Sequence, residues 1–344
     1  MARTAAAYVA CNIYVSAGRS ARSAVLLDVL SKAQARCRVL STTQREKVAL
    51  VHAFADTPYD RSSFHLAGSP ELVTDVASQI ATQALVELST SDASTVGGIT
   101  GTRISGDGGD GGKPMHPFVG IVDHVSVMPL RSLGGVNNEK EHHAFSGQAA
   151  QTIGRALSKA GATVRYYGYA EPNNTPLAKV RREQTEFFKP GGQSSKKSEL
   201  ESEIPKYGTA TVGAPPNFVE NFNIRLSSRC SKEVAKMLTK TLRERDGGIV
   251  GVEALTLPYS RDRFEVACNL LQPSTGTAKM IYVAALEWAR MNGGESIIEE
   301  AYQVGTTEQQ CLEVLSRQAD DFDRNERQVY QNFAGFLSID SSVK

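Results

Sequence analysis

The sequence has few of the features that mark membrane, secreted or nucleic-acid-binding proteins. No apolar run approaches the roughly 20 residues that a membrane-spanning helix needs. The five cysteines are odd in number and scattered without a CxxC pair, which favours a reduced interior over a disulfide framework or a zinc site. Because strand-like sequence begins at about residue 6, we expect no targeting peptide.

The charge balance is nearly neutral, with 38 basic and 37 acidic residues and a formal net charge of +1. A dedicated nucleic-acid or membrane-surface protein usually carries a strong excess of basic residues, which is missing here. We therefore expect a cytoplasmic protein that neither binds nucleic acid nor inserts into a membrane.

The length of 344 residues predicts about two domains. Residues 217–304 show the pattern strand, helix, strand, strand, helix, strand, which is the split βαβ order of a ferredoxin-like layer. The first half shows a similar order with additions. We therefore predict an α+β fold of two ferredoxin-like subdomains that face each other across a cleft.

Composition also marks the expected boundaries. Two stretches without core residues, at about 92–113 and 189–206, are expected to be flexible insertions. Pro215-Pro216 separates an N-terminal subdomain, 1–214, from a C-terminal subdomain, 215–315. The segment 316–344 carries a helix-period stripe, expected to dock on its own domain or to contact a partner, made of Phe322, Val329, Phe333, Phe336 and Leu337.

The stretch Met115–Leu130 carries the first candidate for chemistry. From Phe118 the residues alternate, so that one strand face is aliphatic with Asp123 as its discordant member, while Gly120 and His124 lie on the mixed face. His116 precedes a proline, is therefore biased to extended backbone, and projects at the mouth of the strand. It is a candidate general base, and the alternative is a partly buried structural histidine.

The spacing His-Pro, two residues, Gly, two residues, Asp over 116–123 resembles the formimidoyltransferase domain of formimidoyltransferase-cyclodeaminase. Five other segments also resemble the family and occur along the chain in the family's order: 55–66, 166–170, 207–214, 222–226 and 269–271. The resemblance covers roughly residues 6–315 and does not include the cyclodeaminase half.

The resemblance implies a transferase that moves a formimidoyl or related one-carbon group between an amino-acid-type donor and tetrahydrofolate, mono- or polyglutamylated. It implies His116 as the base that takes a proton from the acceptor nitrogen. The substrate-binding residues would be Arg61, Asp56, Asp123 and Gly120. The folate-binding residues would be Lys206, Tyr207, Gly208, Asn221, Asn223 and Arg225. We also expect a homodimer.

Each of these residues also has a structural interpretation. Arg61 and Asp56 could form a turn salt bridge, Tyr207 could be an interface core residue, and Asp123 could be a buried carboxylate bonded to backbone. The asparagine and arginine faces of strands 217–226 and 262–271 could simply be solvated.

A metal site is not expected. His116 and His124 are eight residues apart on one strand, roughly 26 Å at the usual rise, whereas zinc ligands lie about 2 Å from the ion.

Several positions depart from the family's pattern. Tyr14 stands where an asparagine is usual, Phe54 replaces an acid, and Phe118 replaces an arginine. Without its neighbouring charged groups, a general base is poorly oriented and its pKa is not shifted toward the working pH. The alternative function is therefore a catalytically lapsed member that binds folate or a protein partner.

Overall fold

The computed structural model describes residues 7–18, 22–43, 46–90, 120–131, 139–183, 207–259, 263–317 and 319–338. Their contacts divide the chain into two compact units: unit 1 comprises residues 1–216 and 309–344, and unit 2 comprises residues 217–308. The insertions expected at 92–113 and 189–206 lie outside the described residues.

Unit 1 is built on a six-stranded sheet in the order β2-β3-β1-β4-β6-β5. Its first four strands are antiparallel, and β4, β6 and β5 are mutually parallel. The elements of unit 1 in chain order are β1 (Tyr8–Val15), α1 (Ser23–Thr43), β2 (Val48–Asp56), β3 (Arg61–Gly68), α2 (Pro70–Thr90), β4 (Val122–Leu130), α3 (Glu139–Lys159), β5 (Thr163–Gly168), α4 (Leu177–Glu183) and β6 (Thr209–Ala214), joined by α8 (Glu308–Ser316) and α9 (Ala319–Ser338) from the end of the chain.

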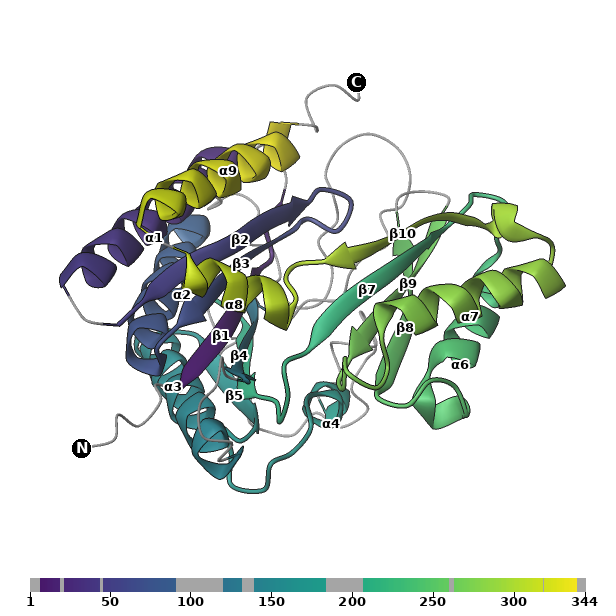
Figure 1. Ribbon diagram of the computed structural model, residues 1–344, viewed down its shortest axis with the longest axis horizontal. Coiled ribbons are helices and arrows are strands. Elements are labelled where there is room, and N and C mark those ends of the chain that lie inside the picture. The colour runs from purple at the N-terminus through teal and green to yellow at the C-terminus, as the bar shows by residue number, and fades with distance from the viewer. Residues whose placement is uncertain are drawn as a thin grey trace, which may run out of the picture. The chain divides into compact units, whose positions relative to one another are not determined.

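Strand alternation sends the aliphatic residues of this sheet to one face. In β1, the side chains of Val9, Cys11, Ile13 and Val15 are fully buried in one core cluster with residues of α1, α2, α3 and α9. Figure 1 shows these helices along the same side of the sheet. The alternate residues of each strand therefore point to the opposite face.

The C-terminal helix α9 belongs to unit 1. Val329, Phe333 and Leu337 enter its core, and the ring of Phe333 lies 5.5 Å from that of Phe64 on β3. Phe336 does not belong to this buried stripe, because 37% of its surface is exposed. The side chain of Phe322 lies outside the described residues.

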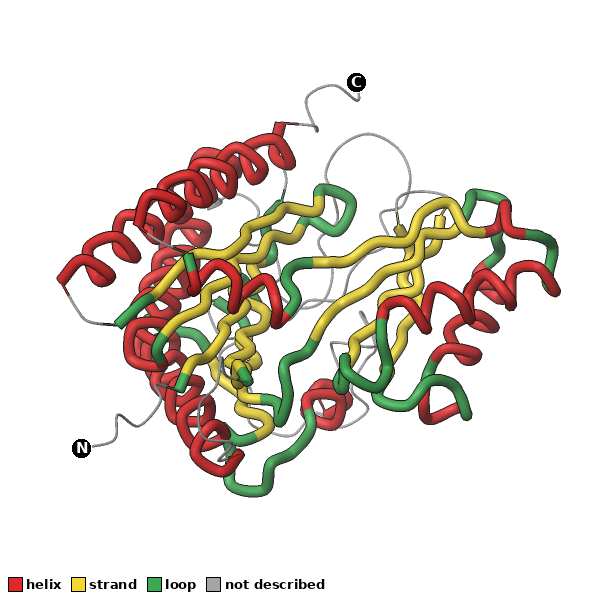
Figure 2. The backbone as a smooth tube through the Cα atoms, viewed as in Figure 1, coloured by secondary structure: helices red, strands yellow, loops and turns green. Residues whose placement is uncertain are grey.

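Unit 2 contains a four-stranded antiparallel sheet in the order β10-β7-β9-β8. Its elements are β7 (Glu220–Leu226), α6 (Lys232–Leu242), β8 (Val252–Tyr259), β9 (Arg263–Leu270), α7 (Ala278–Met291) and β10 (Ile298–Val304). The hydroxyls of Ser231 and Thr277 cap α6 and α7 by accepting from backbone N–H groups of the first turn. Both helices pack on one face of the sheet (Figure 2).

The two units share one connectivity. In unit 1 the first, second, third and fourth strands stand in the order β2-β3-β1-β4, and in unit 2 the corresponding strands stand in the order β8-β9-β7-β10. A helix follows the first and third strand of each set. The mixed α+β class and the strand and helix order predicted for residues 217–304 are thus confirmed.

One detail of the predicted strand alternation is wrong. A register shift between Tyr14 and Val15 of β1 marks a β-bulge at Val122 and Asp123 of β4. Because the extra residue breaks the two-residue period, Val122 enters the helical core instead of sharing a face with His124. Asp123 therefore does not lie on the aliphatic face, where simple alternation had placed it.

Candidate functional site

The face of the six-stranded sheet opposite the helices carries polar side chains from several strands. We define this polar face by Asn12, Tyr14, Ser63, His65, His124, Ser126, Tyr167 and Thr211. All are buried except Tyr14 and His124, which are half-buried. So many buried polar groups on one sheet face require either mutual hydrogen bonds or a ligand.

Next to the polar face, a buried carboxylate is held by two arginines. Asp123 is 1% exposed, and its Oδ2 accepts from the guanidinium of Arg61 at 2.9 Å. Arg181 on α4 donates to Oδ1 of Asp123 at 3.1 Å and to its main-chain oxygen at 3.0 Å. Burial lowers the pKa of Arg181, and the attraction of Asp123 opposes that change. The acid therefore fixes both arginines in place.

The Arg61 guanidinium also lies over an aromatic ring. Its central carbon is 4.7 Å from the centroid of Tyr14, a cation–π arrangement. On the neighbouring strand the imidazole of His124 stacks on Tyr14, with centroids 5.6 Å apart and planes 10° from parallel. Burial raises the pKa of Tyr14, so its phenol stays protonated. The result is a rigid row of planar groups from Arg61 to His124.

Hydrogen bonds continue this row into β5. The Tyr167 hydroxyl donates to Ser126 Oγ at 3.0 Å and lies 3.0 Å from Nε2 of His124. Because a phenol has one proton to give, Nε2 carries the histidine's proton and donates to Tyr167. A Cβ at Gly213 would lie 2.3 Å from the Tyr167 ring, so glycine there makes room for the ring.

The three histidines of this region are neutral at physiological pH. Burial lowers the pKa of His52 to about 4 and that of His124 to about 3, and it lowers the pKa of His65 well below its usual value. General bases work best with a pKa near the working pH. These histidines are therefore suited to hydrogen bonding and stacking, while proton removal at neutral pH needs another group.

Two predicted site regions come together beside β4. Gly120 and Gly208 form an isolated antiparallel bridge, and a Cβ at Gly120 would lie 2.8 Å from the Thr209 oxygen. The Ser16 hydroxyl donates to the oxygen of Gly120 at 2.8 Å. The ring of Tyr207 packs against the core cluster and Gly161. That position matches the core interpretation of Tyr207 better than the stacking one.

Of the remaining predicted site residues of unit 1, the structure describes Asp56 but not His116 or Lys206. Asp56 ends β2, and its Oδ1 accepts from the backbone N–H of Tyr59 at 3.1 Å, so it caps the turn. Arg61 pairs with the carboxylate of Asp123. His116 and Lys206 lie outside the described residues.

In unit 2 the predicted residues of β7 meet a buried glutamate. Glu265 on β9 is 0% exposed, and its Oε1 accepts from Asn223 Nδ2 at 2.7 Å while its Oε2 accepts from the Tyr302 hydroxyl at 2.5 Å. Asn221 donates to Asn269 Oδ1 at 2.6 Å. These amides bind neighbouring strands of their own sheet.

Arg225 is held within the same network. It donates to Glu300 at 2.5 Å and to the hydroxyls of Tyr259 and Tyr302 at 3.0 and 3.1 Å, and its central carbon lies 4.2 Å from the Tyr259 centroid. Glu265 is 3.8 Å from its Nε. A ligand carboxylate at Arg225 would compete with Glu300, the exposed partner.

Sequence reasoning did not find Arg181, Glu265 or Tyr302. Arg181 stands in the basic run 179–182, which is typical of a solvated helix, and nothing in that run distinguishes it.

Among the described residues, no group of three histidine, cysteine, aspartate or glutamate side chains could hold a metal ion. The part of the chain that the structure describes also contains no helix long and apolar enough to cross a membrane.

Comparison with known families gives one match over this region. Residues 111–215 match the N-terminal subdomain of the formiminotransferase domain. A formiminotransferase cyclodeaminase-like protein of Arabidopsis thaliana is 31% identical over an alignment that covers 46% of this chain and 55% of that protein. The chain thus spans about half the length of this curated relative. The two matches confirm the family resemblance.

Two solved structures show only weak similarity to this chain. The peptidase M16 inactive domain from Pseudomonas fluorescens is 10% identical, with 98% of this chain and 87% of that chain covered and a TM-score of 0.23. Pitrilysin is 11% identical, with 98% and 39% covered and a TM-score of 0.21. Such low TM-scores bear on neither fold nor function.

Proposed function

Because residues 111–215 relate this chain to the formiminotransferase domain, we propose that it is a one-carbon transferase. It moves a formimidoyl or related group between an amino-acid-type donor and tetrahydrofolate, which serves as the co-substrate. We also propose that both units are ferredoxin-like, which their shared strand order supports. The cleft between them, the homodimer and the cytoplasmic location stay predictions.

In this proposal His116 removes the proton from the acceptor nitrogen. It lies in the matched segment and a few residues before Asp123, to which the His-Pro spacing ties it. The described histidines of the polar face, His65 and His124, support that assignment indirectly, since their lowered pKa values make them weak bases. General-base help of this kind contributes typically about 10²–10⁴-fold in rate.

The observation that carries the proposal is the pairing of Asp123 with Arg61 and Arg181 beside the polar face. A guanidinium held by a buried acid and by stacking on Tyr14 is pre-oriented, and guanidinium groups bind carboxylates bidentately. We propose that Arg61 binds a carboxylate of the donor. The bridge between Gly120 and Gly208 brings the proposed donor and folate segments together.

A second candidate is a lapsed member that binds folate without turnover. Phe54, which replaces a family acid, lies with its ring 6.1 Å from that of His65, so an apolar group stands beside the polar face. Tyr14, which replaces a family asparagine, fills the space between Arg61 and His124. Both replacements remove groups that could tune a base.

One experiment separates the two candidates. Thermal unfolding with tetrahydrofolate, mono- and polyglutamylated, measures binding, because a ligand of the folded state at a hundredfold excess over Kd adds about 2.7 kcal/mol. Formation of 5-formimidotetrahydrofolate from formimidoylglutamate measures turnover. Stabilisation with turnover supports the transferase, and stabilisation without turnover supports the folate-binding relic. Absence of stabilisation by any reduced folate would reject both.

A further inference from the structure

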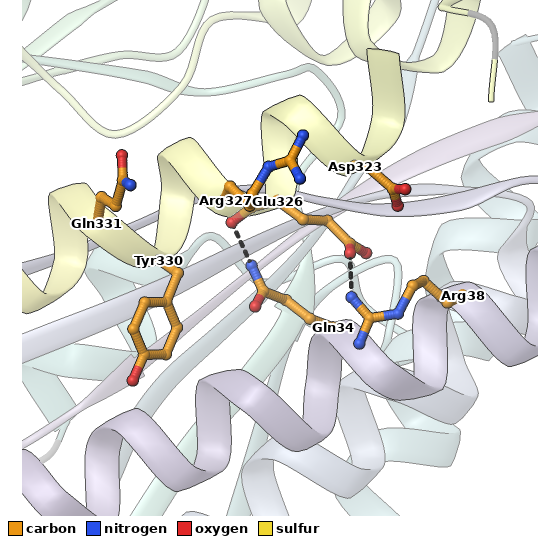
Figure 3. A pocket seen from close by; sticks show the side chains of 7 residues that line it. All are labelled: Gln34, Arg38, Asp323, Glu326, Arg327, Tyr330 and Gln331. Atoms are coloured by element: carbon orange, nitrogen blue, oxygen red, sulfur yellow. Dashed lines mark hydrogen bonds and ion pairs between the residues drawn. The ribbon is translucent and has the colours of Figure 1, made fainter. Parts of the chain in front are cut away.

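A polar groove lies between α1 and α9, on the helical side of the sheet of unit 1. Its volume is about 500 Å³. Gln34 and Arg38 line it from α1, and α9 lines it with Asp323, Glu326, Arg327, Tyr330 and Gln331. Figure 3 shows Gln34, Arg38 and Glu326 converging on the space between the two helices. The groove is separate from the polar face, which is on the other side of the sheet.

The α9 residues of the groove recur at three- and four-residue intervals, so they form one continuous face of the helix. A neighbouring face, with Val329 and Phe333, is buried in the core. The groove face lies beside it and contains two carboxylates, a guanidinium, a phenol and an amide.

Glu326 is the buried centre of the groove, with 3% of its surface exposed. Its main-chain oxygen accepts from Gln34 Nε2 at 2.7 Å, and its Oε2 accepts from Arg38. Its Oε1 is buried and has no hydrogen-bond partner among the described residues. Buried carboxylate oxygens are normally paired, so this oxygen can accept a further hydrogen bond.

The charges around the groove balance. Arg38 and Arg327 contribute two positive charges, and Asp323 and Glu326 contribute two negative ones. A ligand with a single net charge would upset this balance, whereas a dipolar ligand with both signs would meet an opposite partner at each end. The Arg38 side chain is 52% exposed and Arg327 is exposed, so guanidinium groups are accessible at the rim.

We propose that this groove binds a small zwitterion of the α-amino-acid type. Its ammonium group donates to Oε1 of Glu326, which supplies the missing donor, and its carboxylate binds the guanidinium of Arg327. Tyr330, 38% exposed, offers a ring for the ligand's side chain. This assignment does not depend on the transferase proposal.

Binding is tested on the full-length protein by calorimetry and thermal unfolding, with glycine, L-alanine, L-leucine and L-glutamate as probes. Propionate and ethylamine each retain only one of the two charged groups of L-alanine. We expect at least one amino acid to bind in the millimolar range, and propionate and ethylamine to bind at least about tenfold more weakly than L-alanine. Binding of no probe, or equal binding of propionate or ethylamine, would overturn the assignment.

Substitutions of two groove residues test whether the probe binds in the groove. Glu326→Gln and Arg327→Gln should each weaken binding of the probe by about tenfold or more. Arg36→Gln is the matched control, since Arg36 pairs with Asp75 on the exposed surface outside the groove. Arg327 is exposed, so its variant gives a decisive result even where Glu326→Gln unfolds the protein. Unchanged affinity in Arg327→Gln, or equal loss in Arg36→Gln, contradicts the proposal.

Discussion

Arg181 binds both the side chain and the main chain of Asp123, with N–O distances of 3.1 and 3.0 Å. Both residues are almost wholly buried. When Arg181 is removed, Asp123 keeps its ion pair with Arg61 but loses the donors to its Oδ1 and its main-chain oxygen. Leaving buried acceptors of a charged group unpaired costs about 1–3 kcal/mol. Arg181→Met should therefore lower the free energy of unfolding by that order, as measured by urea denaturation.

The neighbouring Arg182 provides the control for this variant. It is exposed, and within the described residues it donates to the Ala178 oxygen of its own helix turn. Arg182→Met should change the free energy of unfolding by less than about 0.5 kcal/mol. Equal effects of the two substitutions would mean that the Asp123 cluster contributes nothing particular to stability.

Stability should fall as the pH drops below the ordinary pKa of histidine. In the unfolded chain histidines take up protons near pH 6.5, whereas in the folded protein the pKa is about 4 for His52 and about 3 for His124. Between those values the unfolded state binds more protons, so unfolding is favoured as pH falls. Each such histidine contributes a slope of about 1.4 kcal/mol per pH unit.

Urea denaturation between pH 6.5 and 5 measures this slope. Replacing His124 by Gln removes one titrating group and should reduce the slope by about 1.4 kcal/mol per pH unit relative to the parent. An unaltered slope in the His124 variant would show that its imidazole is not held neutral.

Gly213 should tolerate no side chain. A Cβ there would lie 2.3 Å from the Tyr167 ring and 2.4 Å from the Tyr167 oxygen, so alanine must displace both. Overpacking of this kind costs about 1–3 kcal/mol, and it should also break the contact of Tyr167 with His124. Gly335→Ala in α9 meets nothing within 4 Å and should stabilise the protein slightly, because alanine favours helix. Thermal unfolding of both variants checks the contrast.

The C-terminal helix should be an integral part of unit 1. Phe333 is fully buried against Phe64, so Phe333→Ala should cost about 3–5 kcal/mol. Phe336 lies on the same helix but is 37% exposed, and its replacement by alanine should cost much less. If the two variants unfold at the same urea concentration, the helix does not depend on this packing.

The strand and helix order of residues 217–304 and the helical stripe of α9 were predicted from the sequence, because a regular element that buries one face repeats its apolar residues at a fixed interval. The sequence did not reveal the bulge at Asp123, because one inserted residue has no periodic signal. Alternation therefore placed Val122 and Asp123 on the wrong faces.

The candidate site was predicted less completely than the fold. Arg61 and Asp123 were each predicted, but their pairing depends on the bulge and on Arg181, which comes from a short basic helix. Asn223 and Arg225 were predicted as folate contacts from the family resemblance and from the strand face that they share. A strand pattern shows which face a side chain takes and cannot show that Glu265 lies on the next strand to bind it.

The most direct test of the proposed function is the rate of formimidoyl transfer from formimidoylglutamate to tetrahydrofolate by the parent protein and by His116→Gln. Glutamine keeps a polar side chain of similar size but cannot act as a base. The account predicts measurable transfer by the parent and a rate about 10²–10⁴-fold lower in the variant, which is roughly 3–5 kcal/mol of barrier. Equal rates in the two proteins, or no transfer by the parent, would contradict it.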